Sequence, residues 1–151
     1  QWLYVNETFG QRLTRFRIAP DGTLSDRETV FGFTDGDFPD GLWFDVEGAV
    51  WVTCIVSNKV MRIFPSEKRA EIVIADTHHD HARAVARAFL DGRMHRPHLD
   101  QNPAPRFKNI SSVAFGGPDQ KTVYLGCLLD TRILSFASPV AGARPPHWDW
   151  A

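Results

Sequence analysis

The sequence has no strong excess of charge of either sign. Its 17 Lys and Arg residues are nearly balanced by 18 Asp and Glu residues, so the 151-residue chain has a formal net charge of −1. The longest charged stretch, residues 66–71, mixes both signs. Proteins that bind nucleic acid or anionic membranes need a cationic surface. We therefore expect no nucleic-acid partner and no membrane partner.

Long hydrophobic runs are also missing. No segment approaches the roughly 18 apolar residues that a membrane-spanning helix requires, and the sequence shows no export signal or lipidation motif. We therefore expect a soluble, cytoplasmic protein. Because the chain starts with Gln1 rather than Met, directly before a strand-like segment, we also expect it to be a piece of a longer protein.

Cysteine is scarce, and catalytic motifs of fixed spacing are absent. Cys54 and Cys127 lie in apolar segments, where a free thiol behaves as a small buried hydrophobic group. We expect no disulfide between them, because nothing else indicates a disulfide-stabilised scaffold. The sequence contains no nucleophile elbow, P-loop, dinucleotide-binding glycine motif or CxxC pair. Function must therefore be sought among acids and amides at strand ends.

Short apolar segments dominate what is present, since 43% of the residues are hydrophobic and 12% are aromatic. These segments are rich in Val, Ile, Phe, Tyr and Trp, and each is bounded by Gly, Asp, Asn or Pro, which is typical of an all-β fold. They cover residues 2–8, 12–19, 27–33, 41–47, 49–56, 59–65, 70–76, 110–117, 122–129 and 132–138.

The strand segments repeat. Residues 3–22, 50–68 and 123–139 share one order: an apolar strand, a short polar turn, and a strand with a basic residue near its start. A four-stranded unit of about 40 residues repeated in tandem is typical of β-propeller blades. The sequence thus predicts a little under three blades. They are a partial blade at 2–33, a full blade at 40–76 and a partial blade at 109–139, followed by a tail at 140–151.

Residues 77–108 interrupt the repeat with a helical period and a Pro-rich loop. Thr77 has the character of an N-cap, and an apolar stripe from Ala82 to Leu90 predicts a helix over about 77–92. Five of the six histidines lie in this insertion. His78 and His81 have a spacing that suits zinc, but no further ligand completes a recognisable pattern. Solvated or packed histidines, or histidines that line a pocket entrance, are the alternatives.

Five turns place an Asp or Asn beside a strand end. Strand ends ring the central channel of a propeller, and oxygen ligands there suit a hard cation such as Ca²⁺. Each side chain also has a simpler explanation, because Asp and Asn are common turn residues. The five residues are Asn6, Asp40, Asn58, Asn109 and Asp130.

Several motifs together resemble the family of regucalcin, gluconolactonase and luciferin-regenerating enzyme. These motifs are "DGTLSDRETVF", "PDGLWFDVEGAVWV", "NKVMRIFP" and "FGGPDQKTVYL". The resemblance implies a six-bladed β-propeller with a divalent metal, Ca²⁺ or Zn²⁺, in its channel and hydrolysis of sugar lactones or similar small cyclic esters. Asp40 then matches a metal-ligand aspartate and a candidate general base.

The same resemblance implies that Ser111 and Ser112 lie near the channel, where one of them faces substrate, with packing within the strand as the alternative, and Asn58 is a further candidate for substrate binding. The family's other usual ligands, a Glu and an Asn, precede the matching segment and have no counterpart here. We consider three hypotheses: a metal-dependent lactonase, a non-catalytic propeller that binds a metal or a small molecule, and a half-propeller. In each case the missing N-terminal half or a second copy of the chain would cover the exposed faces.

Overall fold

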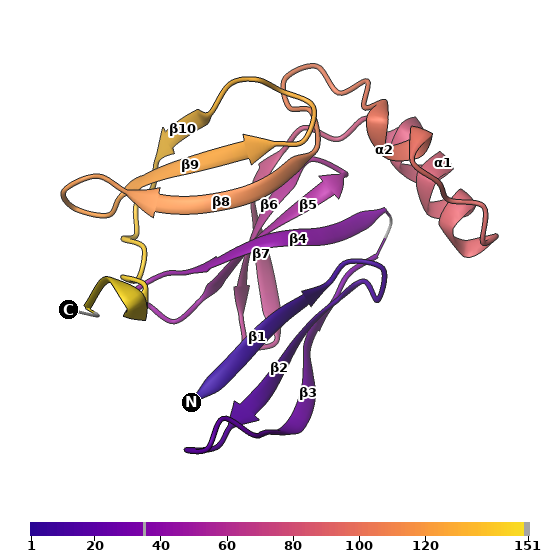
Figure 1. Cartoon of the computed structure of the whole chain (residues 1–151). Coiled ribbons are helices and arrows are strands. Elements are labelled where there is room, and N and C mark those ends of the chain that lie inside the picture. The colour runs from indigo at the N-terminus through magenta and orange to yellow at the C-terminus, as the bar shows by residue number, and fades with distance from the viewer. Residues whose placement is uncertain (35, 150–151) are drawn as a thin grey trace.

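A computed structural model describes residues 1–34 and 36–149 of the chain, which form three antiparallel sheets side by side (Figure 1). The expectation of an all-β fold is confirmed, apart from the helices of the insertion. The first sheet contains β1 (Trp2–Glu7), β2 (Arg12–Ile18) and β3 (Leu24–Gly32), in that order. The second contains β4 (Asp37–Phe44), β5 (Val50–Val56), β6 (Lys59–Phe64) and β7 (Arg69–Ala75). The third contains β8 (Ile110–Gly116), β9 (Thr122–Cys127) and β10 (Leu134–Ala137).

The second sheet is packed between the other two, and β5 shows this most clearly because all seven of its residues are buried. Successive strand residues point to opposite faces. Val50 and Val52 accordingly join a core cluster with Leu13 of the first sheet. Trp51, between them, joins a second cluster with Phe115 of the third sheet. Face-to-face packing of small sheets is the arrangement expected of neighbouring propeller blades.

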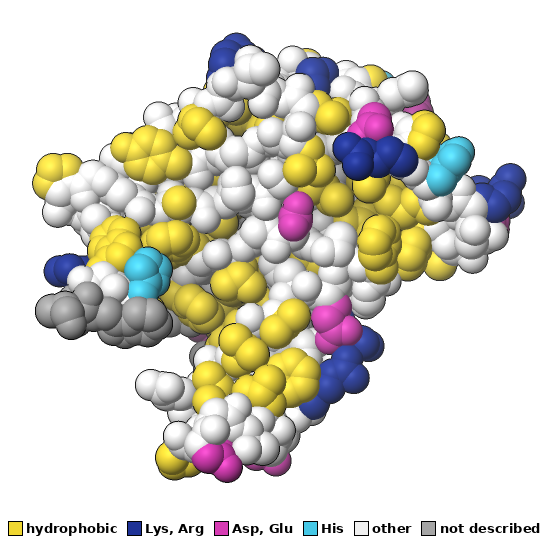
Figure 2. Space-filling model, viewed as in Figure 1, with side chains coloured by type: hydrophobic (Ala, Val, Ile, Leu, Met, Phe, Trp, Pro, Cys, Tyr) yellow, Lys and Arg dark blue, Asp and Glu magenta, His cyan; other side chains and the backbone are white. Residues whose placement is uncertain are grey.

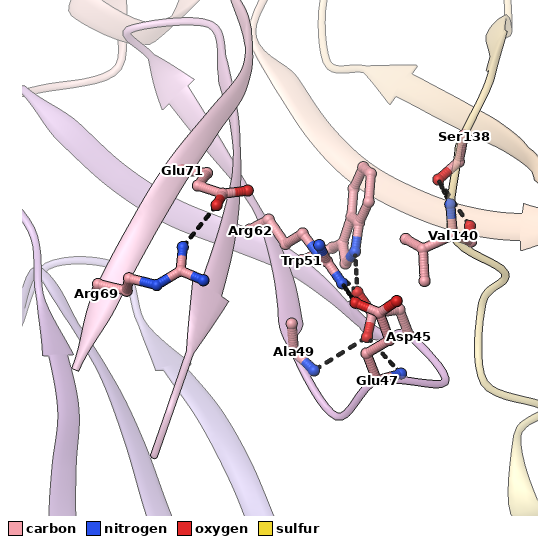
Figure 3. A network of polar contacts seen from close by, with 9 residues as sticks. All are labelled: Asp45, Glu47, Ala49, Trp51, Arg62, Arg69, Glu71, Ser138 and Val140. Carbon is pink, nitrogen blue, oxygen red and sulfur yellow. Dashed lines mark hydrogen bonds and ion pairs between the residues drawn. The ribbon is translucent and has the colours of Figure 1, made fainter. Parts of the chain in front are cut away.

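A buried carboxylate fixes the connection between β4 and β5 (Figure 3). Asp45 Oδ1 accepts hydrogen bonds from the backbone N–H groups of Glu47 (2.9 Å) and Ala49 (3.0 Å). Asp45 Oδ2 accepts from Trp51 Nε1 (2.9 Å) and from Arg62 Nε (2.7 Å). A buried charge is tolerated when it is paired and fully hydrogen-bonded. Sequence reasoning treated this residue only as part of a family motif and gave it no role.

The insertion contains two helices rather than one, namely α1 (His79–Leu90) and the short α2 (Pro97–Asp100), which lies in the segment predicted as a loop. The predicted N-cap is wrong. Thr77 instead donates its hydroxyl to Ser57 O (2.5 Å), and His78 caps α1 by accepting from His81 N. Leu90, expected on the buried stripe, is 80% exposed, because the helix buries Ala82, Val85 and Ala88 instead.

Buried polar side chains hold the two ends of the insertion together. Asp76, at its start, accepts hydrogen bonds from the backbone N–H groups of Arg106 and Phe107, both at 2.8 Å. Asn109, at its end, accepts from Val56 N (2.9 Å) and donates to Leu99 O (2.5 Å). Because both ends are fixed beside β5, the helices stay next to the start of β4 (Figure 1).

Aromatic contacts fix α1 at the same place. Phe89 of α1 packs against Phe38 of β4 with ring centroids 5.3 Å apart, and against Phe9 of the β1–β2 turn at 6.2 Å. The insertion therefore contacts the β1–β2 turn and also β4, where Phe38 lies two residues before Asp40, the main candidate for a functional residue.

After β10 the tail returns to the second sheet and ends in a 3-10 helix at Pro146–Asp149. Trp43 Nε1 donates to Ala143 O (3.1 Å) at this contact. No helix in the described part of the chain is long and apolar enough to cross a membrane.

Candidate active site

Asp40 lies within β4, at a bulge in its pairing with β5. The sequence placed this residue in a turn before the strand, but β4 begins at Asp37, and the register with β5 shifts between Pro39 and Leu42. A bulge adds residues to one strand and redirects its side chains. Pro39 and Gly41 therefore belong to a strand irregularity and not to a turn.

Gly41 lets the bulge approach the third sheet closely. A Cβ atom at position 41 would lie 2.6 Å from Ser111 O and 2.7 Å from the α-carbon of Ser112, which is closer than real Cβ atoms come. Only glycine allows a backbone approach of this kind. The sequence "PDG" thus serves to bring Asp40 next to β8.

Side chains from neighbouring strands hold the backbone of the bulge. Asn6 Nδ2 of β1 donates to Asp40 O at 2.8 Å and to Gly41 O at 3.3 Å. On β5, Thr53 Oγ1 accepts from Gly41 N at 3.0 Å. All three sheets therefore meet at Asp40, whose main chain is fixed although its side chain is not.

The carboxylate of Asp40 has no hydrogen-bond or ion-pair partner among residues 1–34 and 36–149. The residue is exposed, yet the protein around its carboxyl partly replaces water, and this desolvation raises the pKa of Asp40 above its ordinary value. A carboxyl with a raised pKa is a better general base, and a nearby cation would stabilise its charged form.

Ser111 and Ser112 lie on β8 against Gly41, the residue that follows Asp40. The hydroxyl of half-buried Ser111 donates to Gly126 O (3.3 Å), whereas Ser112 is exposed and rests over Gly126. The backbone of the two serines on β8 thus lies against Gly41, directly after Asp40. Their role in binding substrate stays a prediction.

Asn58 occupies a different kind of place. It is fully buried, its Nδ2 donates to Phe107 O (3.0 Å), and its Oδ1 accepts from Ile110 N (3.1 Å). Both ends of the amide therefore bind backbone at the base of the insertion, and neither is free for a ligand in this structure.

The three remaining Asn and Asp candidates also differ in their surroundings. Asn109 is buried at the base of the insertion, and Asp130 pairs with Arg132 at 2.9 Å. Hydrogen bonds from Arg132 lower the pKa of Asp130 to about 2. Of these residues only Asn6 joins Asp40, and its Oδ1 is buried without a hydrogen-bond partner in the part of the chain that the structure describes. Sequence reasoning named Asn6 as one turn residue among five but did not place it beside Asp40.

A divalent cation fits Asp40 as one of its ligands, because carboxylate oxygens are preferred by hard cations and this one is otherwise unpaired. The described residues contain no group of three or more His, Cys, Asp or Glu side chains placed to hold a metal ion. This includes the described histidines of the insertion. Asp40 therefore forms no metal site with the other described residues alone.

Comparison with known proteins identifies the family. Residues 1–86, which contain β1 to β7 and the first part of α1, match the family described as SMP-30/Gluconolactonase/LRE-like region. The chain belongs to this family. The resemblance seen in its sequence motifs is confirmed by this match.

Two curated relatives are similar to most of the chain. Regucalcin of Danio rerio is 43% identical over 106 residues, which are 69% of this chain and 26% of that protein. "Putative sugar lactone lactonase YvrE" of Bacillus subtilis (strain 168) is 26% identical over 125 residues, which are 82% of this chain and 33% of that protein. The chain spans about a third or less of the length of these relatives.

Two solved structures have a fold similar to that of this chain. A luciferin-regenerating enzyme matches with a TM-score of 0.57 and 18% identity, covering 93% of this chain and 38% of that one. A structure described as a putative gluconolactonase matches with a TM-score of 0.61 and 17% identity, covering 95% of this chain and 37% of that one. At these identities the likeness concerns the fold alone.

Proposed function

We propose that this chain is part of a metal-dependent hydrolase of the gluconolactonase type, which opens a sugar lactone or a similar small cyclic ester. The observation that carries the proposal is the unpaired carboxylate of Asp40, held at a bulge where three sheets meet. The family supports the choice of reaction, because its description includes gluconolactonase and one similar protein is named "Putative sugar lactone lactonase YvrE".

Asp40 has two tasks in this proposal. It contributes an oxygen ligand to a divalent cation, Ca²⁺ or Zn²⁺, and it accepts a proton from the water that attacks the lactone carbonyl. When bound, the cation supplies Lewis-acid polarisation of that carbonyl. Ser111 and Ser112, whose backbone lies against Gly41, would donate hydrogen bonds to substrate hydroxyl or ring oxygens in this proposal.

The remaining ligands come, in this proposal, from the part of the domain that the chain does not span. In the proposed propeller the second sheet has four strands, with β4 next to the channel and β7 at the outer edge. The first sheet has no described strand on the channel side of β1, and the third has no described strand on the outer side of β10. Figure 2 shows hydrophobic side chains exposed over the first sheet. Further blades, up to the six that the family resemblance implies, would cover these side chains and complete the metal site.

Hydrolysis of gluconolactone, followed by acid release in a pH-stat, tests the proposal on the full-length protein. Replacement of the base and ligand by Asp40→Asn should lower the rate about 100-fold or more. Glu71→Gln, on the outer strand β7, is the matched control, because Glu71 is an exposed acid that pairs with Arg69 far from Asp40 in the sheet order. Equal rates for wild type and Asp40→Asn would reject the proposal.

A further inference from the structure

The insertion has a charge distribution that the proposed lactonase function does not use. Residues 77–108 contain six Arg and Lys residues but only three Asp residues, a formal charge of +3 in a chain whose total is −1. Figure 2 shows basic side chains and a His side chain on the surface over α1 and α2, beside acidic ones. Positive charge concentrated in one small segment attracts anions.

A pocket of about 560 Å³ lies in this insertion, between α1 and the segment that leads into α2. No acidic side chain is among the described residues that line it. Its walls are formed by Ala84, Arg87, Ala88, Arg93, His95 and His98. The pocket is therefore lined by cationic or ionisable side chains and by the small side chains of one helix face.

Arg87 differs from the three nearest arginines of α1 and of the segment between α1 and α2. Arg83 pairs with Asp80, Arg93 with Asp91 at 2.5 Å, and Arg96 with Asp100 at 2.7 Å. Each of these three acids thus already has an arginine partner. The guanidinium of Arg87 has no acidic partner among the described residues, although a planar guanidinium is well suited to bind an oxyanion through two parallel hydrogen bonds.

The histidines add hydrogen-bond donors to the same pocket. His95 Nδ1 and His98 Nδ1 lie 2.6 Å apart, so one nitrogen must donate a proton and the other must accept it. The ring that accepts through Nδ1 carries its own proton on Nε2. That N–H group has no hydrogen-bond partner among the described residues, so it can donate to an anion. The pocket is therefore lined by the guanidinium of Arg87 on α1 and by the His95–His98 pair that follows the helix.

Small side chains of α1 line part of the pocket and leave room for a ligand close to the helix. Ala84 and Ala88 are four residues apart, so they lie on the same helix face one turn from each other. We propose that this pocket binds a compact oxyanion of the phosphate class. The site is independent of Asp40 and of the lactonase proposal.

Calorimetric titration of the full-length protein with inorganic phosphate tests this proposal, with sodium chloride of equal ionic strength as the blank. We expect saturable binding of phosphate. Arg87→Ala should raise the dissociation constant for phosphate about tenfold or more, because it removes a charge-assisted hydrogen bond. Arg83→Ala is the matched control: it lies on the same helix, is also exposed, and pairs with Asp80 outside this pocket.

Both variants should fold, because alanine is the strongest helix former and both positions are exposed. A second variant, His95→Gln, should also weaken phosphate binding while Arg83→Ala changes it less than about twofold. Two results would overturn the proposal. One is the absence of saturable binding to the wild type, and the other is an equal loss for Arg83→Ala and Arg87→Ala, which would indicate attraction by general charge.

Discussion

Gly41 of β4 and Ser111 of β8 approach so closely that a Cβ atom on Gly41 would lie 2.6 Å from the backbone oxygen of Ser111. This contact places the Asp40 bulge against the third sheet. The contact is possible because Gly41 has no Cβ atom. Adding one should therefore destabilise the protein.

Gly41→Ala should destabilise the protein by about 2 kcal/mol or more, because the added methyl forces two backbones apart. Urea unfolding of the purified protein measures the change. Gly32→Ala is the control: a Cβ there meets no atom within 4 Å, so that variant should have nearly wild-type stability. Equal losses for the two substitutions would show that the close contact between β4 and β8 is not needed.

Asp45→Ala should cost about 3 kcal/mol of unfolding free energy, because four donors lose a fully buried acceptor. Glu47→Ala removes the other acid that pairs with Arg62 and provides the comparison. The Glu47 side chain is 61% exposed, so this change should cost less than about 1 kcal/mol. The account of the β4–β5 turn fails if the exposed acid contributes as much as the buried one.

The repeat pattern could be predicted from sequence because it depends on local chemistry. Segments such as Val50–Val56 are apolar, β-branched and bounded by turn residues, and these properties favour strands wherever the chain places them. The three repeats in the sequence predicted the three sheets. The helix boundary was less accurate, because Thr77, a good N-cap in isolation, bonds to Ser57 in the neighbouring sheet instead.

The site was only partly predictable, because residues that look alike in the sequence serve different purposes. Asp40 and Asn58 are each a polar residue beside Gly or Ser near a strand end. Contacts with Phe107 of the insertion and Ile110 of β8, about 50 residues further along the chain, occupy both ends of the Asn58 amide. Likewise, the contact between Asn6 and Asp40 joins residues 34 positions apart, and no local pattern reveals it.

Thiol labelling should separate the two cysteines, which are both free. Burial raises the pKa of the Cys54 thiol well above its ordinary value, and the side chain has no exposed surface. Burial also raises the pKa of Cys127, but that residue is only half-buried. We expect a chromogenic disulfide reagent at pH 8 to label Cys127 first and Cys54 only on unfolding, with Cys127→Ser as the control. Rapid labelling of both thiols in the native protein would contradict the packing of β5.

The imidazole of His81 should make the protein less stable in mild acid. Partial burial, followed by the charges of His78 and His98, lowers the pKa of His81 below 6.5. The unfolded chain therefore binds the proton more tightly, so stability is lost as the pH falls from 6.5 toward the folded-state value.

Urea unfolding at pH 7.5 and 5.5 measures this loss, which should shrink in His81→Gln. It should persist in His79→Gln, since His79 is exposed. An unchanged loss in His81→Gln would show that other groups cause it.

The central claim is that Asp40 is a metal ligand, and metal content tests it more directly than any rate. The full-length protein is dialysed against Ca²⁺ or Zn²⁺, and the bound ion is determined by elemental analysis for wild type, Asp40→Asn and Glu71→Gln. We predict one tightly bound ion per chain in the wild type and in Glu71→Gln, and loss of that ion in Asp40→Asn. An equal metal content in all three proteins would contradict the account.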